Sequence, residues 1–118
     1  MRKADEFARA KGIKFLVLIQ PSGCDVSRNR DLMNYTHLQK FKKYRRTNLV
    51  KPVERICLRH EIAYINLFDT FMANDPSSLY FRAGEYHWND KGQRVAAEAT
   101  AAYIVRHGML STDTPLSR

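Results

Sequence analysis

The residues of this chain that are most suited to chemistry lie at 84–98, in the sequence GEYHWNDKGQRVAAE. An imidazole can take a proton from a hydroxyl near neutral pH when an acceptor holds its other ring nitrogen. A carboxylate two residues away can be that acceptor if the backbone turns between them. Glu85 and His87 are therefore candidates for an orienting acid and a general base, and the alternative is a helix entrance that happens to contain a histidine.

Two short apolar runs are the predicted strands that position this segment. They are IKFLVLIQP at 13–21 and IAYINLF at 62–68, with a helix expected between them. The continuous apolar centre of the first run is typical of a parallel strand buried on both faces. Strand, helix and strand in this order predict a βαβ unit. His87 follows the second strand, and we expect it among the loops beyond the carboxyl ends of the strands, where open α/β sheets gather catalytic groups.

Helical spacing predicts a first helix over 2–11, which ends at Gly12. A polar loop over 22–34 and a helical stretch over 35–45 are expected after the first strand. A second long loop is expected over 69–88. The buried face of the first helix is expected to hold Ala4, Phe7 and Ala8.

The helix between the two strands is expected to begin at Asn48 as N-cap, with Pro52 tolerated in its first turn. Its buried face is expected to hold Leu49, Val53, Ile56 and Cys57. Cys24 and Cys57 are too few and too far apart for a zinc site or a CxxC motif, so the sequence predicts no metal and no cofactor. Cys57 is expected to be a buried, inert thiol, and a disulfide with Cys24 is the alternative.

The last helix is predicted over 90–107 and ends at Gly108. Asp90 and Gln93 have the spacing of a capping box at its start. Its buried stripe is expected to consist of mostly small residues that permit close approach to a sheet: Val95, Ala96, Ala99, Ala102 and Tyr103.

Lys and Arg exceed Asp and Glu by 20 to 12, which gives a net charge of +8 and favours anionic partners. The basic residues cluster at 40–59, and such a run is most often a solvated face. No zinc-finger spacing or aromatic RNA-binding signature accompanies it, so nucleic acid is not the expected partner.

The 118 residues suffice for one domain. We expect a single α/β domain at 1–110 and a frayed tail at 111–118. No apolar run approaches the roughly 18 residues of a membrane span. The charged start lacks the apolar core of a signal peptide, so either the protein stays in the cytoplasm or Met1 is not the start of the gene product. Two strands make a poor buried parallel sheet, which predicts half of an α/β domain whose strand edges invite self-association.

The string HWNDKGQRVAA, preceded by LYF, resembles the last conserved block of the SGNH (GDSL-type) hydrolases. It is most similar to the branch with sugar O-acetyl esterases and SGNH-like acetyltransferase domains. The resemblance covers about residues 1–106 and implies the C-terminal half of a flavodoxin-like three-layer sandwich. It also implies Ser-His-Asp acyl transfer on a carbohydrate or lipid ester, with His87 as base, Glu85 as its acid and Trp88 beside the substrate. Trp88 and Asn89 would mainly pack and cap the helix.

The chain departs from that family in two respects. Glu85 stands where the family has Asp, and the Gly-Asp-Ser nucleophile block and the oxyanion-hole Gly and Asn blocks are absent. Ser22 follows the wrong strand for a nucleophile, and we interpret it as a turn residue after Pro21. The sequence therefore predicts a half-domain that carries the base and lacks the serine. The alternatives are a non-catalytic SGNH-derived basic module that binds an anionic polymer, and a small fold that completes its sheet by dimerising.

The remaining candidates have structural explanations. His60 and His107 end helices, where a cation interacts well with the helix dipole, and His37 is expected to be exposed. Asp69 is expected to cap a short turn. Tyr80 and Phe81 are expected in the core.

Overall fold

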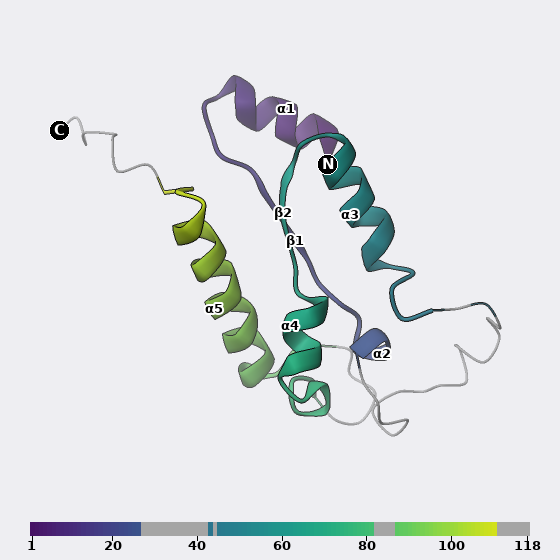
Figure 1. The fold of residues 1–118 in the computed structure, drawn as a ribbon. Coiled ribbons are helices and arrows are strands. Elements are labelled where there is room, and N and C mark those ends of the chain that lie inside the picture. Colours follow the sequence, from purple (N-terminus) through teal and green to yellow (C-terminus); the bar gives the residue numbers. More distant parts are fainter. Residues whose placement is uncertain (27–42, 44, 82–86, 111–118) are drawn as a thin grey trace.

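The computed structural model describes residues 1–26, 43, 45–81 and 87–110, and within them the chain is a mixed α/β protein (Figure 1). Almost all of the predicted 35–45 helix and the 111–118 tail lie outside these residues. The elements in chain order are α1 (Arg2–Ala10), β1 (Leu16–Ile19), α2 (Gly23–Val26), α3 (Val50–Arg59), β2 (Ala63–Asn66), α4 (Phe68–Ala73), the 3-10 turn η3 (Pro76–Ser78) and α5 (Asp90–Arg106).

The two strands pair in parallel, with Leu16 opposite Ala63 and Ile19 opposite Asn66. Strand, helix and strand thus form the βαβ unit that the sequence predicts, although each strand is shorter than its apolar run. Within the described part of the chain, the sheet has these two strands. Leu18 is 41% exposed, so burial on both faces is wrong at this position, because no described element covers it.

The predicted buried face of α3 is correct in part, since Cys57 is buried and Val53 is half-buried. Val50 and Cys57, seven residues apart, are buried, whereas Leu49 and Ile56 are exposed. Leu49 occupies the N-cap position and makes no side-chain capping bond, so the expected Asn48 cap is wrong. The helix starts where Val50 can reach the core rather than where a polar cap is available. Cys57 is a buried free thiol, as predicted.

α1 confirms its predicted extent, and its predicted buried face is correct at Ala8 but not at Ala4, which is exposed. Asp5 and Ala8 are the buried residues, and Phe7 is exposed. Arg9 Nε donates to Asp5 Oδ2 at 2.8 Å, which compensates the partly buried carboxylate. Gly12 has φ +67°, a left-handed conformation that ends the helix as predicted.

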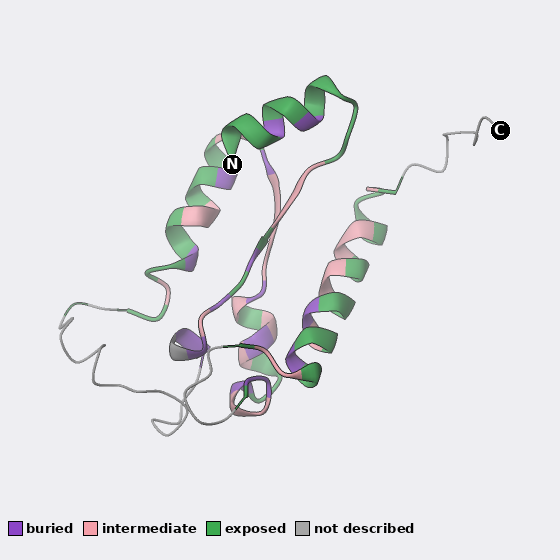
Figure 2. Cartoon of the chain, turned by 180° about the vertical axis from the view of Figure 1, so that it is seen from behind, coloured by how far each residue is buried: buried purple, intermediate pink, exposed green. Residues whose placement is uncertain are grey.

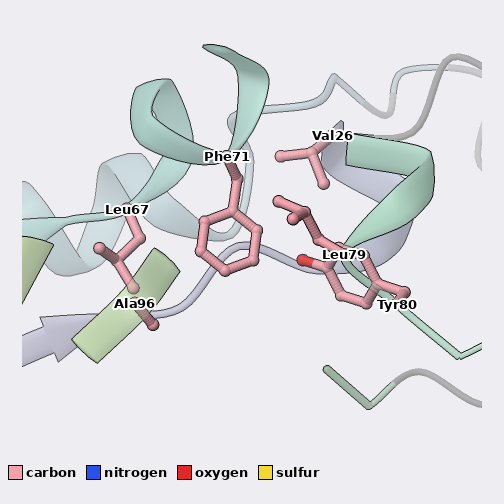
Figure 3. Packing of buried hydrophobic residues seen from close by; sticks show 6 residues of the cluster. All are labelled: Val26, Leu67, Phe71, Leu79, Tyr80 and Ala96. Carbon is pink, nitrogen blue, oxygen red and sulfur yellow. The ribbon is translucent and has the colours of Figure 1, made fainter. Parts of the chain in front are cut away.

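The main core lies beyond the carboxyl ends of the strands (Figure 3). Phe71 of α4 is fully buried against residues from α2, from the segment after η3 and from α5. The cluster consists of Val26, Leu67, Phe71, Leu79, Tyr80 and Ala96. α2 and α4 fall where loops were expected, because tertiary burial rather than helical length stabilises such short helices.

α5 confirms the predicted last helix and its end, since Gly108 has φ +54°. Its N-terminal end lies beside α4 (Figure 1). Ala96 is buried and Ala102 is exposed, so the predicted stripe is correct in part. Val95, Ala99 and Tyr103 are half-buried. None of the described helices is both long and apolar enough to cross a membrane.

Candidate active site at the carboxyl edge of the sheet

The end of β1 is tied to the segment after η3 by a buried tyrosine. The Tyr80 hydroxyl donates to the Pro21 carbonyl at 2.9 Å. Gly23 faces the same ring, since a Cβ atom there would lie 3.3 Å from Tyr80 Cδ1. The Ser22 carbonyl accepts from the backbone N–H of Asp25 at 2.8 Å. Ser22 thus leads into α2, which agrees with its interpretation as a turn residue.

Residues 79–81 and 87–89 pair as two short antiparallel segments. Tyr80 and Trp88 form an isolated β-bridge. The Phe81 N–H donates to the His87 carbonyl at 3.1 Å, and the Asn89 N–H donates to the Leu79 carbonyl at 3.0 Å. These bonds fix the backbone of His87 at the same edge of the molecule as the end of β1.

Asn89 caps α5 and also binds the preceding segment. Its Oδ1 accepts from the Gly92 N–H at 3.0 Å. Its Nδ2 donates to the carbonyls of Ser78 at 2.9 Å and Tyr80 at 3.1 Å. The predicted capping box of Asp90 and Gln93 is therefore wrong, because Asp90 is already the first residue of the helix. The capping role expected for Asn89 from the family resemblance is observed.

Trp88 packs onto the core. Its ring centroid is 5.1 Å from that of Phe71, with the planes at 41°. The Nε1–H is buried and has no hydrogen-bond acceptor among the described residues. Packing against the helix region is thus observed, and a contact between Trp88 and a substrate stays a prediction.

The His87 side chain is exposed, although its backbone carbonyl accepts from the Phe81 N–H beside the bridge of Tyr80 and Trp88. Within the described ranges, no hydrogen bond to its imidazole is present. Glu85 lies outside the described residues, so its pairing with His87 stays a prediction. At this edge the structure therefore presents an exposed imidazole, and the acceptor that a general base needs for its other ring nitrogen is not among the described residues.

The other described histidines end helices, as predicted. His60 is the C-cap residue of α3. His107 is the C-cap residue of α5, and its ring stacks on Tyr103 with centroids 4.0 Å apart. His37 lies outside the described residues.

The loop residues between β2 and α5 differ from expectation in two places. Asp69 is exposed in the first turn of α4 and makes no capping bond, so its expected role is wrong. Asn66 supplies the local bond instead, since its Oδ1 accepts from the Phe68 N–H at 3.0 Å. Tyr80 is buried as predicted, but Phe81 is exposed.

Sequence reasoning missed one ionisable residue at this edge. Asp25 of α2 has a fully buried side chain. A carboxyl group buried just beyond the end of a strand is a candidate for acid/base work. In the sequence, the one indication of this carboxyl group is that Asp25 follows the apolar run of the first strand. In the part of the chain that the structure describes, no three metal-binding side chains gather.

Two perturbed groups lie away from this edge, under α3. Burial raises the pKa of the Cys57 thiol above its ordinary value of 9.0. Burial also raises the pKa of Tyr64, and the Glu54 carboxylate adds to that shift. The Tyr64 hydroxyl donates to Glu54 Oε1 at 3.3 Å. Cys57 belongs to α3 and Tyr64 to β2, so both groups belong to the packing of α3 on the sheet.

Comparisons with known proteins find no relative. No family model matches the chain, and neither a curated protein nor a solved structure is significantly similar to it.

Proposed function

We propose that this chain supplies the histidine base of an SGNH-type ester hydrolase or acyltransferase, whose serine comes from polypeptide outside these 118 residues. The observation that carries the proposal is the exposed His87 imidazole, whose backbone is fixed beside the end of β1 and the start of α5. In open α/β sheets this edge is where catalytic groups gather.

The proposed reaction is acyl transfer from an ester of a carbohydrate or a lipid. His87 removes the proton of the serine hydroxyl as the serine oxygen bonds to the ester carbonyl carbon. The tetrahedral intermediate then expels the alcohol, which takes the proton back from the imidazolium. Water or a second hydroxyl attacks the acyl-serine in the same manner. Glu85 would hold the other ring nitrogen and stabilise the imidazolium.

The corresponding fold is a flavodoxin-like three-layer sandwich, of which this chain would form the C-terminal half. The parallel pairing of β1 with β2 supports this, as does the packing of α3 on the strands. The exposure of Leu18 is also expected if a further element of the same domain covers that strand.

The proposal predicts that the chain alone is not an esterase. No Gly-Asp-Ser block is present, and Ser22 belongs to the turn into α2. Without the nucleophile and the oxyanion-hole donors, the largest contributions to the rate are missing.

The test is turnover of p-nitrophenyl acetate by the chain alone and by the chain extended with the in-frame coding sequence upstream of Met1. His87→Ala is compared with His107→Ala, which removes another exposed histidine near a helix end. The extended protein is expected to lose about a thousandfold in kcat/KM with His87→Ala and little with His107→Ala. A fluorophosphonate probe should label a serine in the extension.

Three results would contradict the proposal. The first is an upstream sequence without a Gly-Asp-Ser segment. The second is turnover that His87→Ala leaves unchanged. The third is turnover that both substitutions reduce equally. A non-catalytic module would show no gain of turnover in the extended protein.

A further inference from the structure

We infer that the outer face of α3 is a docking surface for an acidic, amphipathic segment of a protein partner. This face consists of the cations Lys51, Arg55 and Arg59 together with the apolar side chains Leu49, Ile56 and Leu58. The inference does not depend on the proposed acyl-transfer function, because α3 lies on the far side of the molecule's strands from α5 (Figures 1 and 2).

The three cations form a single row. They are spaced four residues apart, so successive side chains leave the helix about 6 Å apart along its axis. All three are exposed, and no ion pair or hydrogen bond joins their side chains to a described residue. The described ion pairs, Arg2 with Glu6 and Arg9 with Asp5, both lie within α1.

The one acid of α3 does not neutralise this row. Glu54 is half-buried and accepts the Tyr64 hydroxyl of β2, so it points toward the sheet. The row therefore presents an unbalanced line of positive charge to solvent. Such a line attracts an anionic partner, and the attraction weakens as salt is added.

Apolar side chains flank the cations on both sides. Leu58 is 61% exposed, Leu49 is 56% exposed and Ile56 is 40% exposed. At 100° per residue, the cation row lies between Leu58 on one side and Leu49 with Ile56 on the other. Exposed apolar groups gathered around a charged row indicate an interaction surface rather than a plain solvated face.

This pattern favours a protein segment over other anions. Nucleic acid and anionic polysaccharide offer charge but little to cover three large aliphatic side chains. A bilayer would contact a helix whose apolar residues are central and whose cations lie at the sides, and α3 has the reverse order. A partner helix with acidic residues every fourth position has the same 6 Å spacing, and its flanking apolar residues would cover the leucines and isoleucine.

The experiment is fluorescence anisotropy of a labelled amphipathic helical peptide with Glu at every fourth position and Leu on both sides of that row, titrated with the full chain. A peptide with Gln in place of every Glu is the control. We expect saturable binding of the Glu peptide, about tenfold tighter than the Gln peptide and weaker at higher salt.

Two triple variants distinguish binding by the cation row of α3 from binding by the net positive charge of the chain. Lys51→Gln/Arg55→Gln/Arg59→Gln should weaken binding of the Glu peptide about tenfold. The matched variant Lys11→Gln/Arg94→Gln/Arg106→Gln removes the same charge from other exposed positions and should leave binding within about twofold. Leu49→Ser/Ile56→Ser should also weaken binding, whereas a hydrophilic polyanion would not respond to it.

A charge-reversed variant distinguishes a loss of binding from a loss of folding, because it is expected to gain a new ligand. The chain with Lys51→Glu/Arg55→Glu/Arg59→Glu should bind the corresponding Lys peptide and reject the Glu peptide. The inference is overturned if the Glu peptide shows no saturable binding up to about millimolar concentration. It is also overturned if the two triple Gln variants lose affinity equally, or if single-stranded oligonucleotide or phosphatidylserine vesicles bind α3 more tightly than the peptide.

Discussion

Replacing Asn89 by Ala should destabilise the protein more than any other change at the start of α5. The Asn89 amide accepts from the Gly92 N–H and donates to the carbonyls of Ser78 and Tyr80. One side chain therefore caps the start of the helix and binds the preceding segment to it. Asp90, the capping residue expected from the sequence, is exposed and sits inside the helix.

The magnitude follows from these three bonds. Loss of an N-cap side chain costs about 1 kcal/mol. Each of the two part-buried carbonyls loses a donor, at a cost of about 1 kcal/mol apiece. Asn89→Ala should therefore lower the free energy of unfolding by about 3 kcal/mol, and Asn89→Ser, which keeps a capping oxygen, by about 2 kcal/mol. Asp90→Ala should cost about 0.5 kcal/mol or less, through the helix dipole.

Urea unfolding followed by far-ultraviolet circular dichroism measures these differences. Trp88 fluorescence provides a second probe, since this single tryptophan packs against Phe71 in the core. Coincident transitions by the two probes are needed for the comparison of free energies.

The reasoning is refuted if Asp90→Ala costs as much as Asn89→Ala. It is also refuted if Asn89→Ser is as damaging as Asn89→Ala, because the capping bond would then contribute nothing. A cost below about 0.5 kcal/mol for Asn89→Ala would show that water satisfies all three partners in the variant.

Three further predictions concern stability. Gly92→Ala should destabilise by about 2 kcal/mol despite the better helix propensity of Ala, because the new Cβ collides with the Leu79 carbonyl oxygen and lies 3.1 Å from Trp88 Cβ; a stabilised variant in urea unfolding would contradict this. Tyr80→Phe should cost about 1–2 kcal/mol, because the buried Pro21 carbonyl loses its donor, and an unchanged urea midpoint would refute that bond. The raised pKa values of Cys57 and Tyr64 mean that burial favours their protonated forms. Their contribution to stability is thus full at neutral pH. It is lost as pH rises above the ordinary pKa of 9.0 for the Cys57 thiol and above 10.0 for the Tyr64 hydroxyl. Urea unfolding across this alkaline range should show a decline that Cys57→Ala makes shallower, and an identical slope in the variant would exclude the thiol.

The sequence predicts those strands and helices that have a continuous apolar run or a long helical periodicity. The parallel pairing of β1 with β2 follows from two apolar runs and the helix between them, and α5 follows from its small-residue spacing and from Gly108. The same patterns do not determine which face of α1 or α3 is buried. Phe7 and Leu49 are apolar but exposed, because the rotation of each helix depends on the neighbours that it meets.

The short elements could not be predicted, because their stability comes from contacts far along the chain. α2 and α4 place Val26 and Phe71 in the core beside Tyr80. Neither helix is long enough to show an apolar periodicity in its own sequence. The capping assignment at α5 was wrong by one residue. Both Asn89 and Asp90 suit an N-cap, and the bonds of the Asn89 amide to the distant carbonyls of Ser78 and Tyr80 are not visible in the sequence.

The position of the main core divides the molecule into parts with different resistance to opening. Phe71, Leu79 and Tyr80 bury one another at the carboxyl edge, next to the backbone that holds His87. α1 and α3 contribute only four buried residues between them, namely Asp5, Ala8, Val50 and Cys57. Local opening should therefore cost less free energy at α1 and α3 than at the carboxyl edge. A partner that pulls on α3 would loosen that side of the protein while the backbone of His87 stays where it is held.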